Sequence, residues 1–532
     1  MRPRGRSPWL GAGVLAVALA LSRPTPAQPP VSGAVAVLDQ LKAATGGARW
    51  DGVRALVAVG EKTSFGLTGP YLAVEDLATG RFARHADYGL FANAEGLDEA
   101  GRWRMDNSGG VHPLDSDEAR TVAVTEAWLA ARGFLFPERS KATFALQPPA
   151  VDADRAFDRV VATPEGGRAA TLWIDRANHR LARVTIELDS RIETIGYRDY
   201  RSSDGLVLPF DITTDNGDQG EFGEARIARY RLDASAAAEA RRPAARPVDA
   251  AIVSGDAVAY APFRRDVLSG FPIVEASLNG KGPLLFILDT GGHDILTPAA
   301  AAMLGLPLRG SGFSLGAGAG STPTRFTKVD TVALGAARMT RQPFVVLQLD
   351  LGQAMDAAGR PAPIAGIIGL ELFERFTVAL DYAAGRLSLR LPGPDAIAGG
   401  APIRFTSDLP LAEASVDGRA GWFGLDTGNN TEVILYKAWV EANGLPAWFE
   451  VSVDSAGAGV GGPVVFRRGR AGELSLAGWT QAGPPVLLAG DHMGSLSSRA
   501  EAGNIGQSVL SHYTVTFDYA HERVRLDPPA GP

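Results

Sequence analysis

The second half of the chain contains the same sequence twice. Residues 271–288 (FPIVEASLNGKGPLLFIL) end at Asp289, and residues 409–425 (LPLAEASVDGRAGWFGL) end at Asp426. Both segments pass through Glu-Ala-Ser and an apolar stretch into Asp-Thr-Gly, and the two aspartates are 137 residues apart. Two copies are too few for a solenoid, which needs at least about three repeats. The pattern therefore indicates two similar lobes that face each other.

Further matches recur at the same separation. Residues 365–369 (AGIIG) correspond to 502–506 (AGNIG), and residues 381–383 (DYA) correspond to 518–520 (DYA). One constant offset across this length predicts a duplicated unit of about 120 residues.

The first residues have the pattern of a secretory signal peptide. Arginines at 2, 4 and 6 precede an apolar run over 9–21, and a plausible cleavage site lies before Gln28. The apolar run is too short to cross a bilayer core of roughly 30 Å. We expect an exported protein, periplasmic or extracellular, with no membrane span in the mature chain.

Composition divides the rest of the chain. Residues 232–249 are mostly Ala, Arg and Pro, which is typical of a linker. The expected segments are a signal peptide at 1–27, an N-terminal α+β domain at 28–231, a linker at 232–249, lobe 1 at 250–400 and lobe 2 at 401–532.

The N-terminal domain is expected to be a curved antiparallel sheet with two helices. One helix ends before Gly46–Gly47, and the second covers 116–132 with Asp115 as N-cap and Gly133 at its end. The strand signals are clearest at 171–174, 181–188, 206–212 and 226–232, the last closing the sheet. Trp50, Trp103, Trp128 and Trp173 fit a plain core or, less simply, the lining of a lipid cavity.

Each copy places one carboxylate at the end of an apolar strand. Thr290 and Thr427 can form local hydrogen bonds, and Gly291 and Gly428 permit close backbone approach. If the lobes meet on a pseudo-two-fold axis, Asp289 and Asp426 come face to face and share one proton, an arrangement for which aspartic proteases are themselves the standard example. One carboxylate then serves as base for a water and the other as acid.

At this point the sequence resembles a known family. Residues 264–528 resemble retropepsin-like and pepsin-like aspartic proteases in a bacterial secreted form, on the motifs FILDTG (286–291) and FGLDTG (423–428). The second family signature, an apolar pair before Gly, is similar to 367–369 and 504–506. The resemblance implies an all-β bilobal domain made of two retropepsin-like repeats. The N-terminal strand rhythm faintly resembles the lipoprotein-carrier half-barrels of the bacterial envelope.

The resemblance also implies two glycine-rich hairpins over the substrate. They correspond to 314–322, with Gly316 and Gly318, and to 455–462, with Gly457 and Gly459. Neither contains a tyrosine, so the pepsin-type flap tyrosine is absent.

Three positions depart from the family pattern. The residue after Asp-Thr-Gly usually carries a hydroxyl that bonds the outer carboxylate oxygen, whereas here it is Gly292 or Asn429. Asn504 stands where an apolar residue is expected. These changes put the pH optimum and the catalytic power in question. His293 and Asp294 adjoin the first motif and are expected to pack its turn, with tuning of the dyad or contact with substrate as the alternatives.

Other chemistries fit less well. The chain has no cysteine, and its seven histidines have no zinc-type spacing, so we expect neither a metal nor a cofactor. A net charge of −7 disfavours nucleic-acid binding. Matches to G-x-G-x-x-G at 457–462 and to G-x-S-x-G at 312–316 lack the strand and helix context that those motifs require.

The sequence thus predicts an exported aspartic endopeptidase that hydrolyses an extended peptide or protein substrate. Both carboxylates lie on one chain, so a monomer suffices for the dyad. The alternative is a catalytically weak or inert protease fold that serves as an envelope peptide- or lipid-binding module, or a carrier whose N-terminal domain is the working part.

Overall fold

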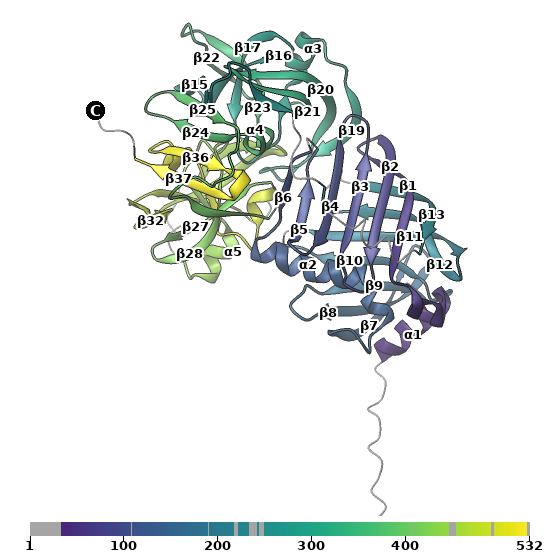
Figure 1. The fold of residues 1–532 in the computed structure, drawn as a ribbon. Helices are drawn as coiled ribbons and strands as arrows, with labels where there is room; N and C mark the ends of the chain where they lie inside the picture. Colours follow the sequence, from purple (N-terminus) through teal and green to yellow (C-terminus); the bar gives the residue numbers. More distant parts are fainter. Residues whose placement is uncertain are drawn as a thin grey trace, which may run out of the picture.

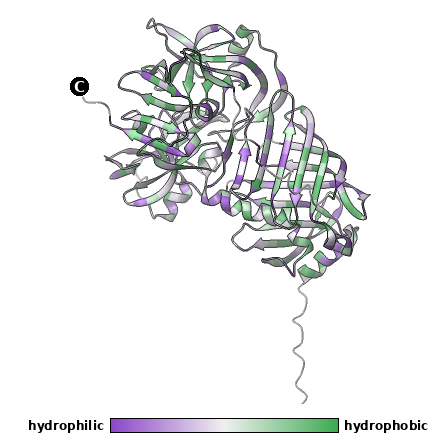
Figure 2. Cartoon of the chain, in the orientation of Figure 1, coloured by the Kyte–Doolittle hydropathy of each residue, from purple (hydrophilic) through white to green (hydrophobic). Residues whose placement is uncertain are grey.

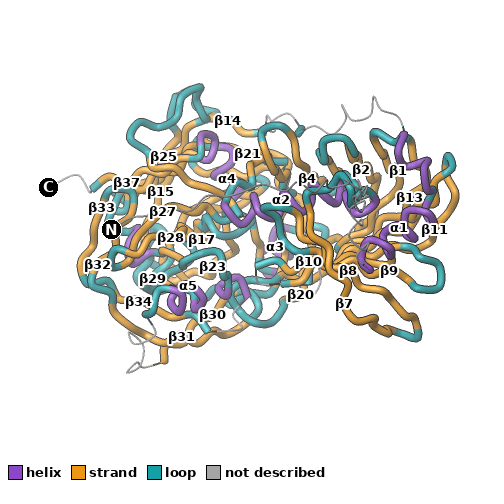
Figure 3. Tube along the Cα trace, turned by 90° about the horizontal axis from the view of Figure 1, so that it is seen from below, coloured by secondary structure: helices purple, strands orange, loops and turns teal. Residues whose placement is uncertain are grey.

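A computed structural model describes residues 33–107, 109–189, 191–217, 222–232, 242–243, 249–406, 408–445, 454–490 and 494–528. The expected signal peptide and nearly all of the expected linker lie outside these residues. The chain forms an N-terminal part and a C-terminal part that are both dominated by strands (Figures 1 and 3). No helix in the described ranges has the length and apolarity needed to cross a membrane.

The N-terminal part contains two α-helices and a large antiparallel sheet. Its helices are α1 (Gly33–Thr45) and α2 (Asp117–Ala130). Its strands are β1 (Ala55–Ser64), β2 (Leu67–Asp76), β3 (Phe82–Asp87), β4 (Ala92–Asp98), β5 (Gly101–Met105), β6 (Val111–Pro113), β7 (Ala142–Asp152), β8 (Arg155–Pro164), β9 (Ala170–Asp175), β10 (Leu181–Glu187), β11 (Ile192–Ser203), β12 (Leu206–Asp215) and β13 (Phe222–Arg231).

The order of this sheet differs from the expected one at its last strand. The order is β6-β5-β4-β3-β2-β1-β13-β12-β11-β10-β9-β8-β7. Strand β13, predicted to close the sheet, instead lies in its middle, with Lys62 of β1 opposite Ala225 and Ile212 of β12 on the other side of Ala225. The two meanders are thereby joined through β1 and β13, and β6 and β7 form the edges.

The caps of helix α2 also differ from the prediction. The hydroxyl of Ser116, not Asp115, accepts the hydrogen bond from the backbone N–H of Ala119 (3.1 Å). The Asp115 carboxylate accepts instead from the N–H of Phe405 (3.2 Å), in lobe 2. After the helix, Arg132 rather than Gly133 adopts the left-handed conformation. Gly133 is required for a different reason, since a Cβ there would lie 2.1 Å from the Trp128 ring.

Three of the four tryptophans in the N-terminal domain are core residues. Trp50, Trp103 and Trp128 are buried, whereas Trp173 is half-buried and lies under the guanidinium of Arg183 (3.8 Å). Buried apolar residues alternate with polar ones along the strands (Figure 2). This arrangement supports the plain core rather than a tryptophan-lined cavity.

Among its described residues the C-terminal part has four short α-helices and the remaining strands. The helices are α3 (Pro298–Leu304), α4 (Leu370–Arg375), α5 (Lys437–Ala442) and α6 (Gln507–Leu510). The strands of lobe 1 are β14 (Ala250–Ile252), β15 (Ala259–Arg265), β16 (Pro272–Leu278), β17 (Lys281–Leu288), β18 (Ile295–Leu296), β19 (Arg309–Ser314), β20 (Thr322–Leu334), β21 (Ala337–Leu347), β22 (Gln353–Met355), β23 (Pro361–Ile368), β24 (Thr377–Asp381) and β25 (Arg386–Arg390). Those of lobe 2 are β26 (Ala401–Phe405), β27 (Pro410–Val416), β28 (Arg419–Leu425), β29 (Val433–Leu435), β30 (Asp454–Gly459), β31 (Gly462–Arg470), β32 (Glu473–Leu476), β33 (Trp479–Ala482), β34 (Pro485–Leu488), β35 (Gly503–Ile505), β36 (Thr514–Asp518) and β37 (Arg523–Asp527).

The same strand pairing occurs in both lobes. In lobe 1, β17 is antiparallel to β16 and parallel to β23, and β23 is antiparallel to β18. In lobe 2, β28 is antiparallel to β27 and parallel to β35, and β35 is antiparallel to β29. The ends of β17 and β28 are continuous apolar runs because strands with a parallel neighbour are buried on both faces.

The two lobes share a sheet and a core. Strand β24 of lobe 1 pairs with β36 of lobe 2, with Val378 opposite Phe517. One hydrophobic cluster continues from Phe286 and Leu288 of lobe 1 to Phe423 and Leu425 of lobe 2. Because this core spans the junction, the strands that end in the two aspartates are fixed relative to each other.

Candidate active site

The two aspartates occupy equivalent places in the two lobes. The backbone N–H of Asp289 donates to the carbonyl of Ile368 (3.0 Å), and that of Asp426 donates to the carbonyl of Ile505 (3.0 Å). Each aspartate thus directly follows a buried strand and lies beside the second residue of the matched pair, Ile368 in lobe 1 and Ile505 in lobe 2. Residues 367–369 and 504–506, matched in sequence, therefore also occupy equivalent positions beside the two aspartates.

The threonines bond across the lobe junction rather than locally. The N–H of Thr290 donates to the hydroxyl of Thr427 (3.0 Å), and the N–H of Thr427 donates to the hydroxyl of Thr290 (2.9 Å). The Thr290 hydroxyl donates onward to the carbonyl of Leu425 (2.7 Å), and the Thr427 hydroxyl to that of Leu288 (2.8 Å). Both threonines are fully buried. Because each threonine makes the same hydrogen bonds to the opposite lobe, the two loops are joined in a nearly two-fold symmetric arrangement.

The glycines of each loop face the aspartate of the other loop. A Cβ at Gly428 would lie 2.4 Å from the Asp289 carboxyl carbon, and a Cβ at Gly291 would lie 3.1 Å from that of Asp426. Only a residue without a side chain permits both carboxyls to approach this closely. The N–H of Gly291 also donates to Asp289 Oδ1 (2.7 Å).

The environment of the pair favours a shared proton. Burial and then the charge of Asp426 raise the pKa of Asp289 to about 8. Burial also raises the pKa of Asp426, against the hydrogen bond from Asn504. Both aspartates are half-buried, and two adjacent carboxyls shielded in this way do not readily ionise together, so we expect the pair to carry one proton at neutral pH.

The two carboxyls differ in their donors. Asp426 accepts from the side-chain amide of Asn504 (2.7 Å) and from the backbone N–H of Asn429 (3.0 Å). The amide of Asn429 in turn donates to the side-chain carbonyl of Asn504 (2.8 Å). Asn504, which departs from the family pattern in sequence, therefore belongs to the candidate site, and the sequence flagged it without assigning a role.

Gly292 leaves the first carboxyl without such a side-chain donor. A Cβ at this position would lie 3.3 Å from Asp289 Oδ2, so a hydroxyl side chain there would reach the outer oxygen. The donor set consequently favours the charge on Asp426 and the proton on Asp289.

The two glycine-rich hairpins meet each other. Residues 315–321 connect β19 to β20, and residues 460–461 connect β30 to β31. The N–H of Gly318 donates to the carbonyl of Val460, and that of Gly320 to Gly461, both at 2.9 Å. A Cβ at Gly316 would lie 2.7 Å from Val460, and one at Gly459 would lie 2.9 Å from Ala317. Gly457 lies further along β30, against Val464 and Phe466.

A buried cluster of charged residues lies beside the first aspartate loop. His293 donates to Glu371 (Nδ1 to Oε1, 2.9 Å) and to Asp408 (Nε2 to Oδ2, 3.1 Å). Burial alone would lower the pKa of His293, but these two carboxylates raise it well above its ordinary value. The N–H of Asp294 donates to Glu371 Oε2 (2.8 Å). His293 and Asp294 thus tie the end of the loop to Glu371 of lobe 1, and His293 also joins it to Asp408 of lobe 2.

The same cluster contains the one group of described residues with metal-ligand spacing. Ligand atoms of Asp106, His293 and Glu371 all lie within 4.8 Å of one another. Both ring nitrogens of His293 already point at carboxylates, as expected of an imidazolium. We therefore interpret the group as an ion network.

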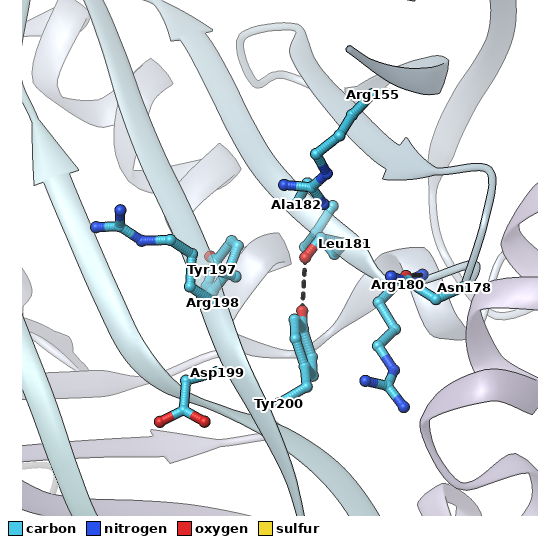
Figure 4. Close-up of a pocket in the computed structure, with 9 residues that line it drawn as sticks. All are labelled: Arg155, Asn178, Arg180, Leu181, Ala182, Tyr197, Arg198, Asp199 and Tyr200. Carbon is cyan, nitrogen blue, oxygen red and sulfur yellow. Dashed lines mark hydrogen bonds between the residues drawn. The ribbon is translucent and has the colours of Figure 1, made fainter. Parts of the chain in front are cut away.

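A separate pocket of about 230 Å³ lies in the N-terminal domain. Three arginines, Arg155, Arg180 and Arg198, border it, but their guanidinium groups point in different directions (Figure 4). Tyr200 closes one side by donating to the carbonyl of Leu181 (2.6 Å). None of the predicted site residues lines this pocket.

Comparison with known proteins agrees with the sequence over lobe 1. Residues 274–372 match the family model described as aspartyl protease. This segment contains Asp289 and the apolar pair before Gly369, and it ends before Asp426. No curated protein matches the chain.

Solved structures similar to the chain include three bacterial proteins. A putative outer membrane lipoprotein-sorting protein domain from Vibrio parahaemolyticus is 12% identical, with 38% of this chain and 92% of that chain covered and a TM-score of 0.27. A DUF1329 family protein from Desulfovibrio piger is 11% identical (38% and 93% covered, TM-score 0.26), and a LolA superfamily protein from Nitrosomonas europaea is 13% identical (38% and 93% covered, TM-score 0.27).

Proposed function

We propose that the protein is an exported aspartic endopeptidase built from two retropepsin-like lobes. The observation that carries the proposal is the convergence of Asp289 and Asp426 on a junction made by reciprocal threonine bonds. The aspartyl protease match over 274–372 supports the same reaction class.

The donor asymmetry supports separate roles for the two carboxyls. Asp426, which accepts from Asn504 and Asn429, carries the negative charge and serves as general base for a water held between the pair. Asp289 carries the proton and donates it to the carbonyl oxygen of the scissile peptide as the water attacks. The resulting tetrahedral intermediate collapses when the leaving amine takes a proton from the dyad.

The hairpins provide a way to bind an extended substrate. Their tips contact each other through backbone bonds at Gly318 and Gly320. A peptide must separate these tips to enter, and its backbone then pairs with the hairpin strands as an added strand. We therefore expect recognition of an extended peptide or protein segment with no cofactor.

Two matched peptides test the proposal: one carries a hydroxyl in place of the scissile carbonyl and can only bind, and the other is cleavable and reports turnover. Calorimetric titration of the full chain should show binding that is weakened in Asp289→Asn, and a matched cleavable peptide should be hydrolysed. Binding with no hydrolysis of any peptide would instead support the inert binding module. Hydrolysis that persists in Asp289→Asn would contradict the dyad.

A further inference from the structure

The N-terminal domain contacts the protease part next to the first catalytic loop. The backbone N–H of Asp115 donates to the carbonyl of Phe405 (3.0 Å), and the hydroxyl of Thr406 donates to that of Ser116 (2.9 Å). These contacts join the segment between β6 and α2 to the end of β26. They fix the edge strand β6 against the protease part (Figure 1).

One side chain of β6 enters the buried charge cluster. His112 is 7% exposed, and its Nδ1 lies 3.1 Å from Glu374 Oε1 on α4. Its Nε2 lies 3.6 Å from Asp408 Oδ1, and Arg104 of β5 lies 3.4 Å from the other oxygen of Asp408. The ring also packs against Phe405 (5.5 Å between centroids). The N-terminal domain thus adds His112 and Arg104 to a buried cluster that already holds His293 and Arg375 beside its carboxylates.

The contacts of His112 continue to the loop that bears Asp289. Asp408 Oδ1 faces His112 Nε2 at 3.6 Å, an ion-pair distance longer than a hydrogen bond, and Asp408 Oδ2 accepts from His293 (3.1 Å). His293 bonds Glu371, which accepts from the N–H of Asp294 (2.8 Å). Asp294 Oδ1 accepts from the N–H of Gly369 (2.9 Å), and the N–H of Leu370 donates to the carbonyl of Gly292 (2.8 Å). The loop that bears Asp289 and the segment at 369–371 that supports it are therefore both connected to Asp408.

The charges in this pocket depend on one another. Asp106 and Glu374 lie together, and a Cβ at Gly110 would lie 1.8 Å from Glu374 Oε2. Arg375 donates to both oxygens of Asp249 (2.8 and 2.9 Å) and also lies 3.6 Å from Glu374 Oε2. Removing the charge of His112 leaves Asp408 and Glu374 with less compensation in a buried site, so the cluster must rearrange.

We propose that His112 is a positioning residue that the N-terminal domain supplies to the active site. It fixes the first catalytic loop through Asp408 and His293, so the protease part is complete only when the N-terminal domain is docked. The inference rests on the proposed function for its catalytic meaning, whereas the coupling of His112 to the loop can be tested without substrate.

Amide hydrogen exchange of the full chain tests this coupling. In His112→Gln we expect exchange in peptides over 289–294 and 369–371 to accelerate about tenfold, with β9 and β10 unchanged. His85→Gln is the matched control, since His85 is an exposed histidine on β3 of the same domain. If His112→Gln fails to fold, Asp408→Asn removes the connecting charge and should give the same local acceleration. Exchange at the wild-type rate in these peptides would overturn the proposal.

Kinetics separate this inference from the proposed function. With a cleavable peptide, His112→Gln should lower kcat about tenfold to a hundredfold while KM changes little, because His112 does not contact substrate. His85→Gln should match the wild type in both. Acceleration of exchange with no cleavage even by the wild type would refute the protease while leaving the coupling intact. A wild type that cleaves and a His112→Gln variant with unchanged kcat would refute the coupling alone.

Discussion

Thr290 and Thr427 each donate a backbone N–H to the hydroxyl of the other, at 3.0 and 2.9 Å, across the junction of the two lobes. Each hydroxyl then donates to a carbonyl of the opposite lobe. The separation of Asp289 and Asp426 is consequently set by the junction itself, and neither lobe can move without breaking buried bonds. The relative position of the two aspartates therefore depends on both lobes of the C-terminal part.

Replacing one of these threonines should destabilise the protein. Thr427→Val keeps the shape but leaves the N–H of Thr290 and the carbonyl of Leu288 without partners in a buried site. We expect a loss of roughly 2–4 kcal/mol in the free energy of unfolding. Urea titration measures it, with the exposed Thr480→Val as control. A loss equal to that of the control would show that the junction does not depend on these bonds.

Neutralising one aspartate should not destabilise the fold. Because burial and the charge of Asp426 raise the pKa of Asp289, ionisation of the pair costs stability as the pH rises. Asp289→Asn should therefore unfold at the same temperature as the wild type or a higher one at pH values near 8. Scanning calorimetry measures this, and a marked decrease in the unfolding temperature would contradict the mutual repulsion.

The pH profile of cleavage should have its alkaline limb near the upper pKa of the dyad. Activity requires one proton on the pair, and that proton is lost as the pH rises through about 8. We expect kcat/KM to remain substantial at neutral pH and to fall above that value. A profile that has already fallen well below neutral pH would show that the pair is less buried or better solvated than described.

Asn504 should control the acidic limb. Asn504→Leu restores the apolar residue typical of the family, but it removes the donor to Asp426 Oδ2 (2.7 Å). Because the hydrogen bond from Asn504 lowers the pKa of Asp426, its loss raises the pKa of that carboxyl. The acidic limb of the kcat/KM profile should move upward accordingly. An unmoved limb would exclude Asp426 as the carboxylate that titrates there.

His112 should link domain docking to pH. Burial opposes its charge, but Asp408 and Glu374 raise the pKa of His112 to about 9. Its contribution to stability is therefore present below its unfolded pKa of about 6.5 and is lost as the pH rises towards 9. The unfolding temperatures of wild type and His112→Gln should differ at about pH 6 and converge at about pH 9.5. A difference that stays constant over this range would contradict the charged state of His112.

The features that could be predicted from the sequence are those that follow from its repeat and from its apolar runs. The constant offset between Asp289 and Asp426 predicted the two equivalent loops, and the apolar run before each aspartate predicted its buried strand. The position of β13 could not be predicted, because strand order depends on long-range pairing such as that between Lys62 and Ala225.

The buried charge cluster lay beyond sequence reasoning for a different reason. His112 and Glu374 are 262 residues apart, and neither belongs to a periodic pattern or a motif. Asn504 was visible only as a departure from the family pattern, since its partner Asp426 lies 78 residues earlier and meets it only after β28 pairs with β35.

The most direct test of the dyad is cleavage of a quenched peptide library from acid to neutral pH by wild type and Asp289→Asn side by side. We predict that the wild type cleaves and that Asp289→Asn is slower by about a thousandfold, as expected when a general acid is lost. Equal rates for the two proteins at any pH would contradict the account.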